Sequence, residues 1–94
     1  MLFHYIYVLE SLKDKKRYVG YTADLKRRVE EHHKGFVFAT KPRLPVRLIY
    51  FEGCFSEADA KRRERYLKTT QGRRFLGLRL LQHQRQGRAL GAGS

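Results

Sequence analysis

The Glu64 carboxylate is the first candidate for chemistry, because it stands where an acidic side chain is unusual. Glu64 shares one helical stripe with Ala60 and Leu67, at the spacing i, i+4 and i+7, and its neighbours along the chain are mostly Lys and Arg. A carboxylate on an apolar stripe needs a partner, since burying an unpaired charge is costly. It either pairs with Lys68 or binds a hard cation such as Mg²⁺, which takes one or two carboxylates and keeps several waters.

A second group of candidates shares a stripe upstream, where Leu25, Arg28 and His32 fall at i, i+3 and i+7. This spacing puts the Arg28 guanidinium near the edge of the core, where it could bind a phosphate through two parallel hydrogen bonds. The alternative is an ordinary surface arginine. His32 is a candidate ligand, proton-transfer group or helix-capping residue.

Tyrosines form the third group, with Tyr5, Tyr7, Tyr18 and Tyr21 in two short stretches. Such residues are ordinary core material. A tyrosine with a pKa of about 10 is almost entirely protonated at pH 7, but nearby cations favour its charged form. In a chain of net charge +12, a tyrosine is therefore also a candidate proton acceptor.

Three strands are expected to position these groups. Residues 5–9, 17–21 and 46–51 are rich in aromatic and β-branched residues, and a polar turn at 11–16 joins the first two strands into a hairpin. Pro42 and Pro45 keep the segment before the third strand from becoming helical. None of the three strands shows a clean alternation of apolar and polar residues. We therefore expect a sheet with one covered face and one functional face.

Helices are predicted between and after the strands. Asp24 is a candidate N-cap for a helix that runs to about His33 and is ended by Gly35. Ser56 begins a sequence like a capping box, which predicts a second helix through about Thr69.

A third helix is expected after Gly72, and two sets of residues could face the core. These sets are Phe75, Leu78 and Leu81, or Leu76 and Leu80. The order β-β-α-β-α-α predicts an α+β fold. We assign residues 1–82 to one domain. Residues 83–94, where the helical spacing of apolar residues is lost, are assigned to a flexible C-terminal tail.

Composition restricts the class of protein. With 94 residues, 41% of them hydrophobic, the chain can form one small core and is not intrinsically disordered. Cys54 has no partner for an intrachain disulfide, no apolar run approaches the ~18 residues of a membrane span, and residues 1–9 lack a basic leader. We therefore expect a reduced, soluble, cytoplasmic protein without a membrane partner, for which a polyanion is the leading ligand.

These residues together resemble the GIY-YIG nuclease family, in its small single-domain branch. The first motif appears as Tyr5-Ile6-Tyr7 and the second as Tyr18-Val19-Gly20. Arg28 then matches the arginine-bearing helix, His32-His33-Lys34-Gly35 resembles an H-x-x-G sequence, and residues 57–68 resemble the glutamate-bearing helix. The resemblance covers about residues 3–81. Tyr5 replaces the family's first glycine, and the chain contains no asparagine where several family nucleases have one near the metal.

The resemblance implies a three-stranded antiparallel sheet flanked by three helices, and a metal-dependent endonuclease that hydrolyses DNA phosphodiester bonds. Glu64 would bind one Mg²⁺ or Mn²⁺, and Arg28 would stabilise charge on the phosphate. Tyr7 or Tyr18 would orient or deprotonate the attacking water, with help from His32. Structured or branched DNA, in repair or recombination, is the expected substrate, RNA is an alternative, and either a monomer or a homodimer is compatible with the sequence.

The remaining cations are expected to bind the phosphate backbone without reading its sequence. The candidates are Lys13, Lys15, Lys16, Lys34, Lys41, Arg43, Arg62, Arg63, Arg73 and Arg74. Two other functions compete with the nuclease: a nucleic-acid-binding module that keeps this fold without catalysis, which the absence of asparagine favours, and a basic structural protein of a ribonucleoprotein.

Overall fold

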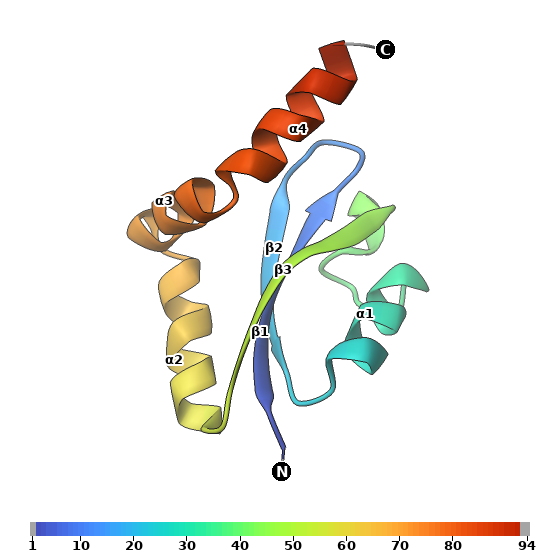
Figure 1. Ribbon diagram of the computed structural model, residues 1–94. Helices are drawn as coiled ribbons and strands as arrows, with labels where there is room; N and C mark the ends of the chain where they lie inside the picture. The colour runs from blue at the N-terminus through green and yellow to red at the C-terminus, as the bar shows by residue number, and fades with distance from the viewer. Residues whose placement is uncertain (1, 93–94) are drawn as a thin grey trace.

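The sheet is three-stranded and antiparallel, with strand order β2-β1-β3, as predicted (Figure 1). The computed structural model describes residues 2–92, and the side chains of residues 2–86. Its strands are β1 (His4–Ser11), β2 (Arg17–Thr22) and β3 (Val46–Cys54). The central strand is therefore β1, and β2 and β3 form the two edges.

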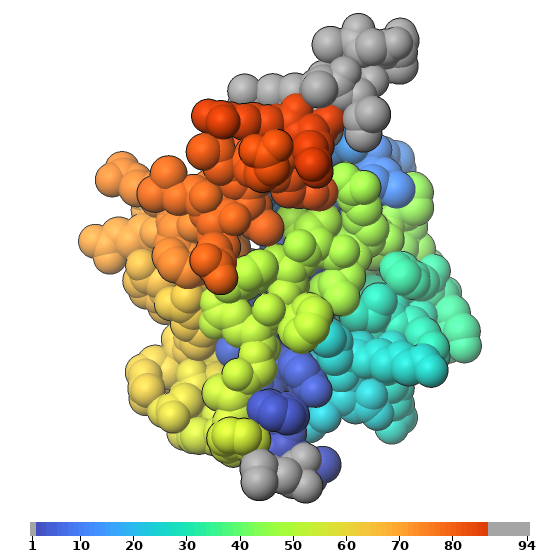
Figure 2. Space-filling view, in the orientation of Figure 1, coloured from blue at the N-terminus to red at the C-terminus, as the bar shows by residue number. Residues whose placement is uncertain are grey.

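Helices cover both faces of the sheet, so the expectation that only one face is covered is wrong. Helix α1 (Leu25–His33) lies on one side, and α2 (Glu57–Leu67) and α3 (Thr70–Arg79) lie on the other (Figure 1). Figure 2 shows β3 between the α2 layer and the α1 layer. The weak alternation of the strands follows from this arrangement, because a strand buried on both faces needs few polar residues.

Strand β1 supplies two hydrophobic cores from alternate residues. Ile6 and Val8 pack in the core under α2 and α3, whereas Tyr7 and Leu9 belong to the core on the α1 side, together with Val46. The four β1 side chains are almost completely buried. Successive side chains of β1 therefore point to opposite faces of the sheet, and the strand holds the α1 layer and the α2–α3 layer together.

Both predicted N-caps are present. The side chain of Asp24 accepts a hydrogen bond from the Arg27 backbone N–H at 3.2 Å, and Ser56 accepts one from the Asp59 N–H at 3.2 Å. After α1, Gly35 has a φ of 78°, a backbone conformation that favours glycine. These local signals place the beginnings of α1 and α2, and hence the residues that each helix turns toward the sheet.

Gly72 lies inside α3 rather than between two helices as predicted. A Cβ at this position would overlap the backbone carbonyl oxygen of Tyr66, so glycine permits a close approach of α3 to the end of α2. The N-cap is Thr69, which accepts from the Gly72 N–H at 3.1 Å. Leu76 and Leu80 are buried and Leu78 is exposed, which selects the second of the two predicted core sets.

The chain continues as helix α4 (Leu81–Ala92), where the sequence predicts no regular element. Leu, Gln and Arg favour helix even without apolar periodicity, which explains the difference. His83 lies 3.3 Å from the carboxylate of Glu10, which also pairs with Arg47, so α4 contacts one end of the sheet. The flexibility of residues 83–94 stays a prediction, and residues 93–94 lie outside the described part. Within residues 2–92, no helix is long and apolar enough to cross a membrane.

Candidate active site

The Tyr7 side chain lies across the neighbouring strand. Tyr7 on β1 is the register partner of Gly20 on β2. A Cβ added at Gly20 would overlap the Cζ and hydroxyl of Tyr7. The glycine of the second motif therefore leaves room for the tyrosine of the first, and the hydroxyl extends toward the β2 edge of the sheet.

His32 connects this tyrosine to the segment after α1. The Tyr7 hydroxyl lies 2.8 Å from His32 Nε2, and His32 Nδ1 lies 2.7 Å from Thr40 Oγ1. All three side chains are buried. The sequence predicts Tyr7 and His32 as candidates but gives no signal for Thr40, a loop residue brought to the site by the turn at Gly35.

Burial fixes the protonation of this group. It raises the pKa of Tyr7 to about 12, opposed in part by the adjacent Arg28 guanidinium, while Tyr18 and Glu64 raise it further. Burial also lowers the pKa of His32 to about 4, and the positive charge of Arg28 adds to this effect. Near neutral pH, Tyr7 is therefore a protonated phenol and His32 a neutral imidazole. The His32 tautomer whose Nδ1–H donates to Thr40 leaves Nε2 free to accept the Tyr7 proton.

The low pKa of His32 makes stability depend on pH. Below the ordinary value of 6.5, the unfolded chain binds a proton that the folded protein binds only near pH 4. We expect the free energy of unfolding to fall as pH drops from 6.5 to 4, by ~3 kcal/mol in total, with no contribution from this group above pH 6.5. Urea unfolding across this range should show this decrease of the unfolding free energy with falling pH in the wild type. It should show the same decrease in His33→Gln, a control at an exposed position. An equal slope in His32→Gln would contradict the assignment.

Arg28 presents an unused donor to the site. Its Nη1 donates to Glu31 Oε1 at 3.2 Å, whereas its Nε is buried and has no acceptor among the residues that the structure describes. A buried donor without a partner is costly, and a charged one more so. A bound anion would satisfy this N–H, and a guanidinium is shaped for two oxygens of a phosphate.

Glu64 reaches the same region from α2, which covers the face of the sheet opposite to α1. Its side chain is 21% exposed and pairs with Lys68, with Nζ and Oε2 3.5 Å apart. Its charge nevertheless contributes to the raised pKa of Tyr7. Within the described residues, no three His, Cys, Asp or Glu side chains form a metal-binding group. A single carboxylate still fits Mg²⁺, which is usually held by one or two carboxylates together with water and substrate phosphates rather than by an all-protein cage.

The site therefore joins the two layers at the β2 edge. Helix α1 supplies Arg28 and His32, α2 supplies Glu64, and Tyr7 extends from the central strand. The ring of Tyr18 lies beside them, with its centroid 6.3 Å from that of Tyr7 and 5.3 Å from that of His32. The sequence motifs fall on separate elements, and the fold brings all five predicted side chains to one region.

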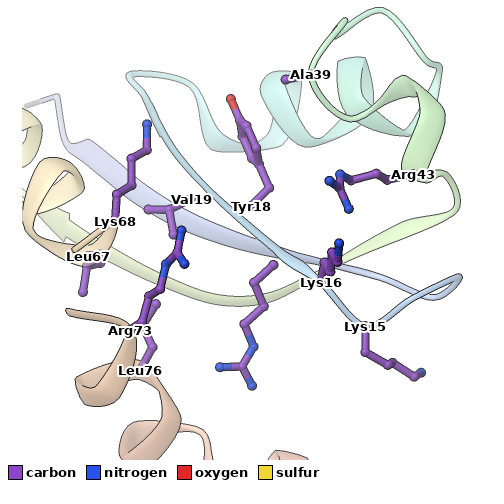
Figure 3. A pocket seen from close by; sticks show the side chains of 11 residues that line it. Lys15, Lys16, Tyr18, Val19, Ala39, Arg43, Leu67, Lys68, Arg73 and Leu76 are labelled. Carbon is purple, nitrogen blue, oxygen red and sulfur yellow. The ribbon is translucent and has the colours of Figure 1, made fainter. Parts of the chain in front are cut away.

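A basic groove of about 800 Å³ adjoins Tyr18 (Figure 3). In this view Tyr18 stands between Lys68 on one side and Arg43 on the other. The groove also contains the apolar side chains of Val19, Ala39 and Leu76. Its cations are Lys15, Lys16, Arg17, Arg43, Lys68 and Arg73. This concentration of positive charge beside the Tyr7–His32 pair suits a polyanion.

The groove contains only some of the cations that the sequence analysis selects. Lys15, Lys16, Arg43 and Arg73 line it, whereas Lys13, Lys34, Lys41 and Arg74 do not. Arg17 and Lys68 were not among the candidates, because no spacing rule predicts that the hairpin would lie opposite the end of α2.

Arg62 and Arg63 lie elsewhere, with acidic partners. Arg63 donates to both oxygens of Glu52, from Nε at 2.9 Å and Nη2 at 3.0 Å, and Arg62 donates to Asp59 at 2.7 Å. Their side of α2 faces β3, and they line a different hollow. Their proposed contact with nucleic acid stays a prediction.

The fold and these side chains define a catalytic domain of the GIY-YIG class. The family model described as "GIY-YIG catalytic domain" matches residues 3–79, and the chain belongs to this family. The resemblance seen in the motifs is thereby confirmed, and the family is one of nucleases.

Curated relatives carry the name UPF0213 protein. One from Haloquadratum walsbyi is 40% identical over 68 residues, 71% of this chain and 75% of that protein. One from Streptococcus pneumoniae serotype 4 is 45% identical over 65 residues, 68% of this chain and 65% of that protein. The solution NMR structure of a UPF0213 protein from Bacillus halodurans is 35% identical, with a TM-score of 0.50, and the match covers 79% of this chain and 81% of that one.

Proposed function

We propose that this protein is a metal-dependent endonuclease that hydrolyses DNA phosphodiester bonds. The observation that carries the proposal is the convergence of Tyr7, Arg28, His32 and Glu64 beside a basic groove. A structural role in the core accounts for Tyr7 and His32, but it does not account for the unused donor of Arg28. An anionic substrate would explain both the buried Tyr7–His32 pair and the unused Arg28 donor.

Arg28 would hold the scissile phosphate. The buried Nε supplies a donor that no described residue uses, and a phosphate oxygen is a strong acceptor for it. As negative charge grows on the phosphate oxygens in the transition state, the fixed guanidinium interacts with it more strongly. Glu31 keeps the guanidinium in place through its contact with Nη1.

Tyr7 and His32 would move the proton of the attacking water. A phenol with a pKa of about 12 does not act as a preformed phenolate, so it takes a proton only while it releases its own. His32 Nε2, 2.8 Å away, would be the acceptor in the tautomer whose Nδ1–H donates to Thr40. Tyr18 lines the groove and would orient the water.

Glu64 would hold one Mg²⁺ or Mn²⁺. The ion, when bound, would withdraw charge from the phosphate and stabilise the leaving oxygen. The ion pair with Lys68 is an i,i+4 contact worth only a few tenths of a kcal/mol, so it does not oppose this role. Lys68 also lines the groove, where it can turn to a DNA phosphate.

The basic groove predicts steep salt dependence of binding. If about five phosphates are neutralised, the slope of log K against log salt should be about −4 to −5 for duplex DNA. The double variant Lys15→Ala, Lys16→Ala should reduce the magnitude of this slope by about 2, as measured by fluorescence anisotropy. Lys61→Ala, whose charge pairs with Glu57 outside the groove, should leave the slope nearly unchanged. A wild-type slope near zero would contradict the proposed surface.

Cleavage of end-labelled DNA tests the proposed activity. Single-stranded, duplex, flap and four-way-junction substrates would be incubated with Mg²⁺, Mn²⁺ or EDTA. Cutting that needs the metal ion supports the endonuclease and ranks its substrates. Salt-sensitive binding without any cutting would instead favour a binding module, the alternative that the absence of asparagine supports.

A further inference from the structure

The segment between α1 and the short helix η1 (Lys41–Arg43) is held firmly at both ends. The Phe36 N–H donates to the Glu31 carbonyl at 2.9 Å, and the Thr40 N–H donates to the Val37 carbonyl at 3.2 Å. Val37 is buried, and the Thr40 hydroxyl bonds to His32. These contacts hold residues 36–40 in place, and one of them, between Thr40 and His32, belongs to the candidate active site.

Two phenylalanines project from this fixed segment into solvent. Phe36 is 74% exposed and Phe38 is 92% exposed. Neither ring stacks on another aromatic ring within the described residues, in contrast to Phe55, whose ring stacks on Phe3 with centroids 4.8 Å apart. Exposed aromatic side chains on a rigid segment beside a functional site indicate a binding surface.

Phe38 directly precedes a residue that lines the basic groove. Ala39, the residue after Phe38, lines the groove together with Tyr18 and Arg43, and Figure 3 shows the three around its upper end. Cations that follow the backbone, combined with aromatic rings on which bases stack, are how proteins bind single-stranded nucleic acid. A base in a duplex has both faces covered by its neighbours, so a side-chain ring can stack only on an unpaired or terminal base.

We infer that Phe38 stacks on an unpaired base of the strand whose phosphates occupy the groove. This inference rests on the proposed function and deepens it, because it selects DNA with a single-stranded segment at the cut site over continuous duplex. The groove cations act on either form of DNA, whereas the Phe38 ring acts only on the unpaired one.

Binding measured in EDTA tests the inference without cleavage. The probes are a fluorescein-labelled oligothymidylate of about 15 nucleotides and a duplex of equal length. Phe38→Ala should weaken binding of the single strand about 5- to 100-fold and change duplex binding less than about twofold. Phe55→Ala, which removes an exposed ring remote from the groove, should change neither. Equal weakening of both probes by Phe38→Ala, or no weakening of either, would overturn the inference.

A tryptophan reports stacking directly, because the chain contains no Trp. The fluorescence of Phe38→Trp should be quenched as the oligothymidylate saturates the protein, and that of the control Phe55→Trp should not change. An unquenched Phe38→Trp at saturation would also overturn the inference.

Both tests use metal-free protein, so they are separate from the cleavage assay. DNA cutting by the wild type, together with unchanged binding in Phe38→Ala, would refute the stacking alone. No cutting, together with quenched fluorescence in Phe38→Trp, would refute the catalysis alone.

Discussion

Glu64→Gln is expected to lower kcat/KM for DNA cleavage at least ~1,000-fold, which corresponds to about 4 kcal/mol of transition-state stabilisation. The substitution keeps the size of the side chain and removes the charge that would hold the metal ion. The lost contact with Lys68 is an i,i+4 pair of small energy, so the free energy of unfolding should change by less than about 0.5 kcal/mol. Single-turnover cleavage, together with binding in EDTA, separates loss of chemistry from loss of affinity.

Glu57→Gln provides the matched control for this prediction. Glu57 lies on the same helix and makes the same kind of pair, with Lys61 Nζ 3.0 Å away, but it stands apart from Tyr7 and the groove. It should cleave DNA at the wild-type rate. Equal activity of Glu64→Gln and Glu57→Gln would remove Glu64 from the mechanism, whatever the metal dependence of the wild type.

Gly20→Ala is expected to damage both stability and activity. The added Cβ would overlap the Tyr7 ring, which has no free space because it packs between β2 and His32. Overpacking of this kind costs about 1–3 kcal/mol of unfolding free energy. Displacement of the Tyr7 hydroxyl from His32 should also slow cleavage ~100-fold, since a shift of about 1 Å in a reacting group has an effect of that size. Urea unfolding and single-turnover cleavage measure the two effects.

Gly53→Ala separates the local clash from the general effect of alanine in a strand. At Gly53 on β3, an added Cβ would lie 3.4 Å from the nearest Tyr5 ring atom, which is an ordinary contact. We expect this variant to fold and cleave like wild type. If Gly20→Ala behaved the same way, the Tyr7 ring would have more freedom than its packing indicates, and its placement would not limit the reaction.

Local chemistry made much of the fold predictable. Caps at Asp24 and Ser56, and the glycine after α1, depend on neighbours within a few residues, so the sequence locates them. The position of Gly72 inside α3 was not predictable in the same way. It depends on how closely the end of α2 approaches, which is a tertiary contact. Helix α4 was missed because its residues favour helix without forming an apolar stripe.

The candidate site also combines features that local sequence predicts with features that depend on tertiary contacts. Motif spacing predicts Tyr7, Arg28, His32 and Glu64 as candidates, and all four lie within the residues that the family model matches. The hydrogen bond from His32 to Thr40, and the groove formed by the hairpin and the end of α2, depend on segments that are distant in sequence. Charge counting found the excess of cations but not their partners. It could not separate Lys15, which lines the groove, from Arg63, which is paired with Glu52.

The alternation along β1 also protects the protein against folding into a shifted alignment. A slip of one residue would turn Ile6 and Val8 toward α1 and carry Tyr7 into the layer under α2. Both cores would be disrupted at once, so such a state would lack the apolar packing that a chain of this size needs. Any molecule that folds stably therefore has its tyrosine hydroxyl facing His32, and errors of alignment should appear as aggregation or degradation rather than as folded protein with a misplaced site.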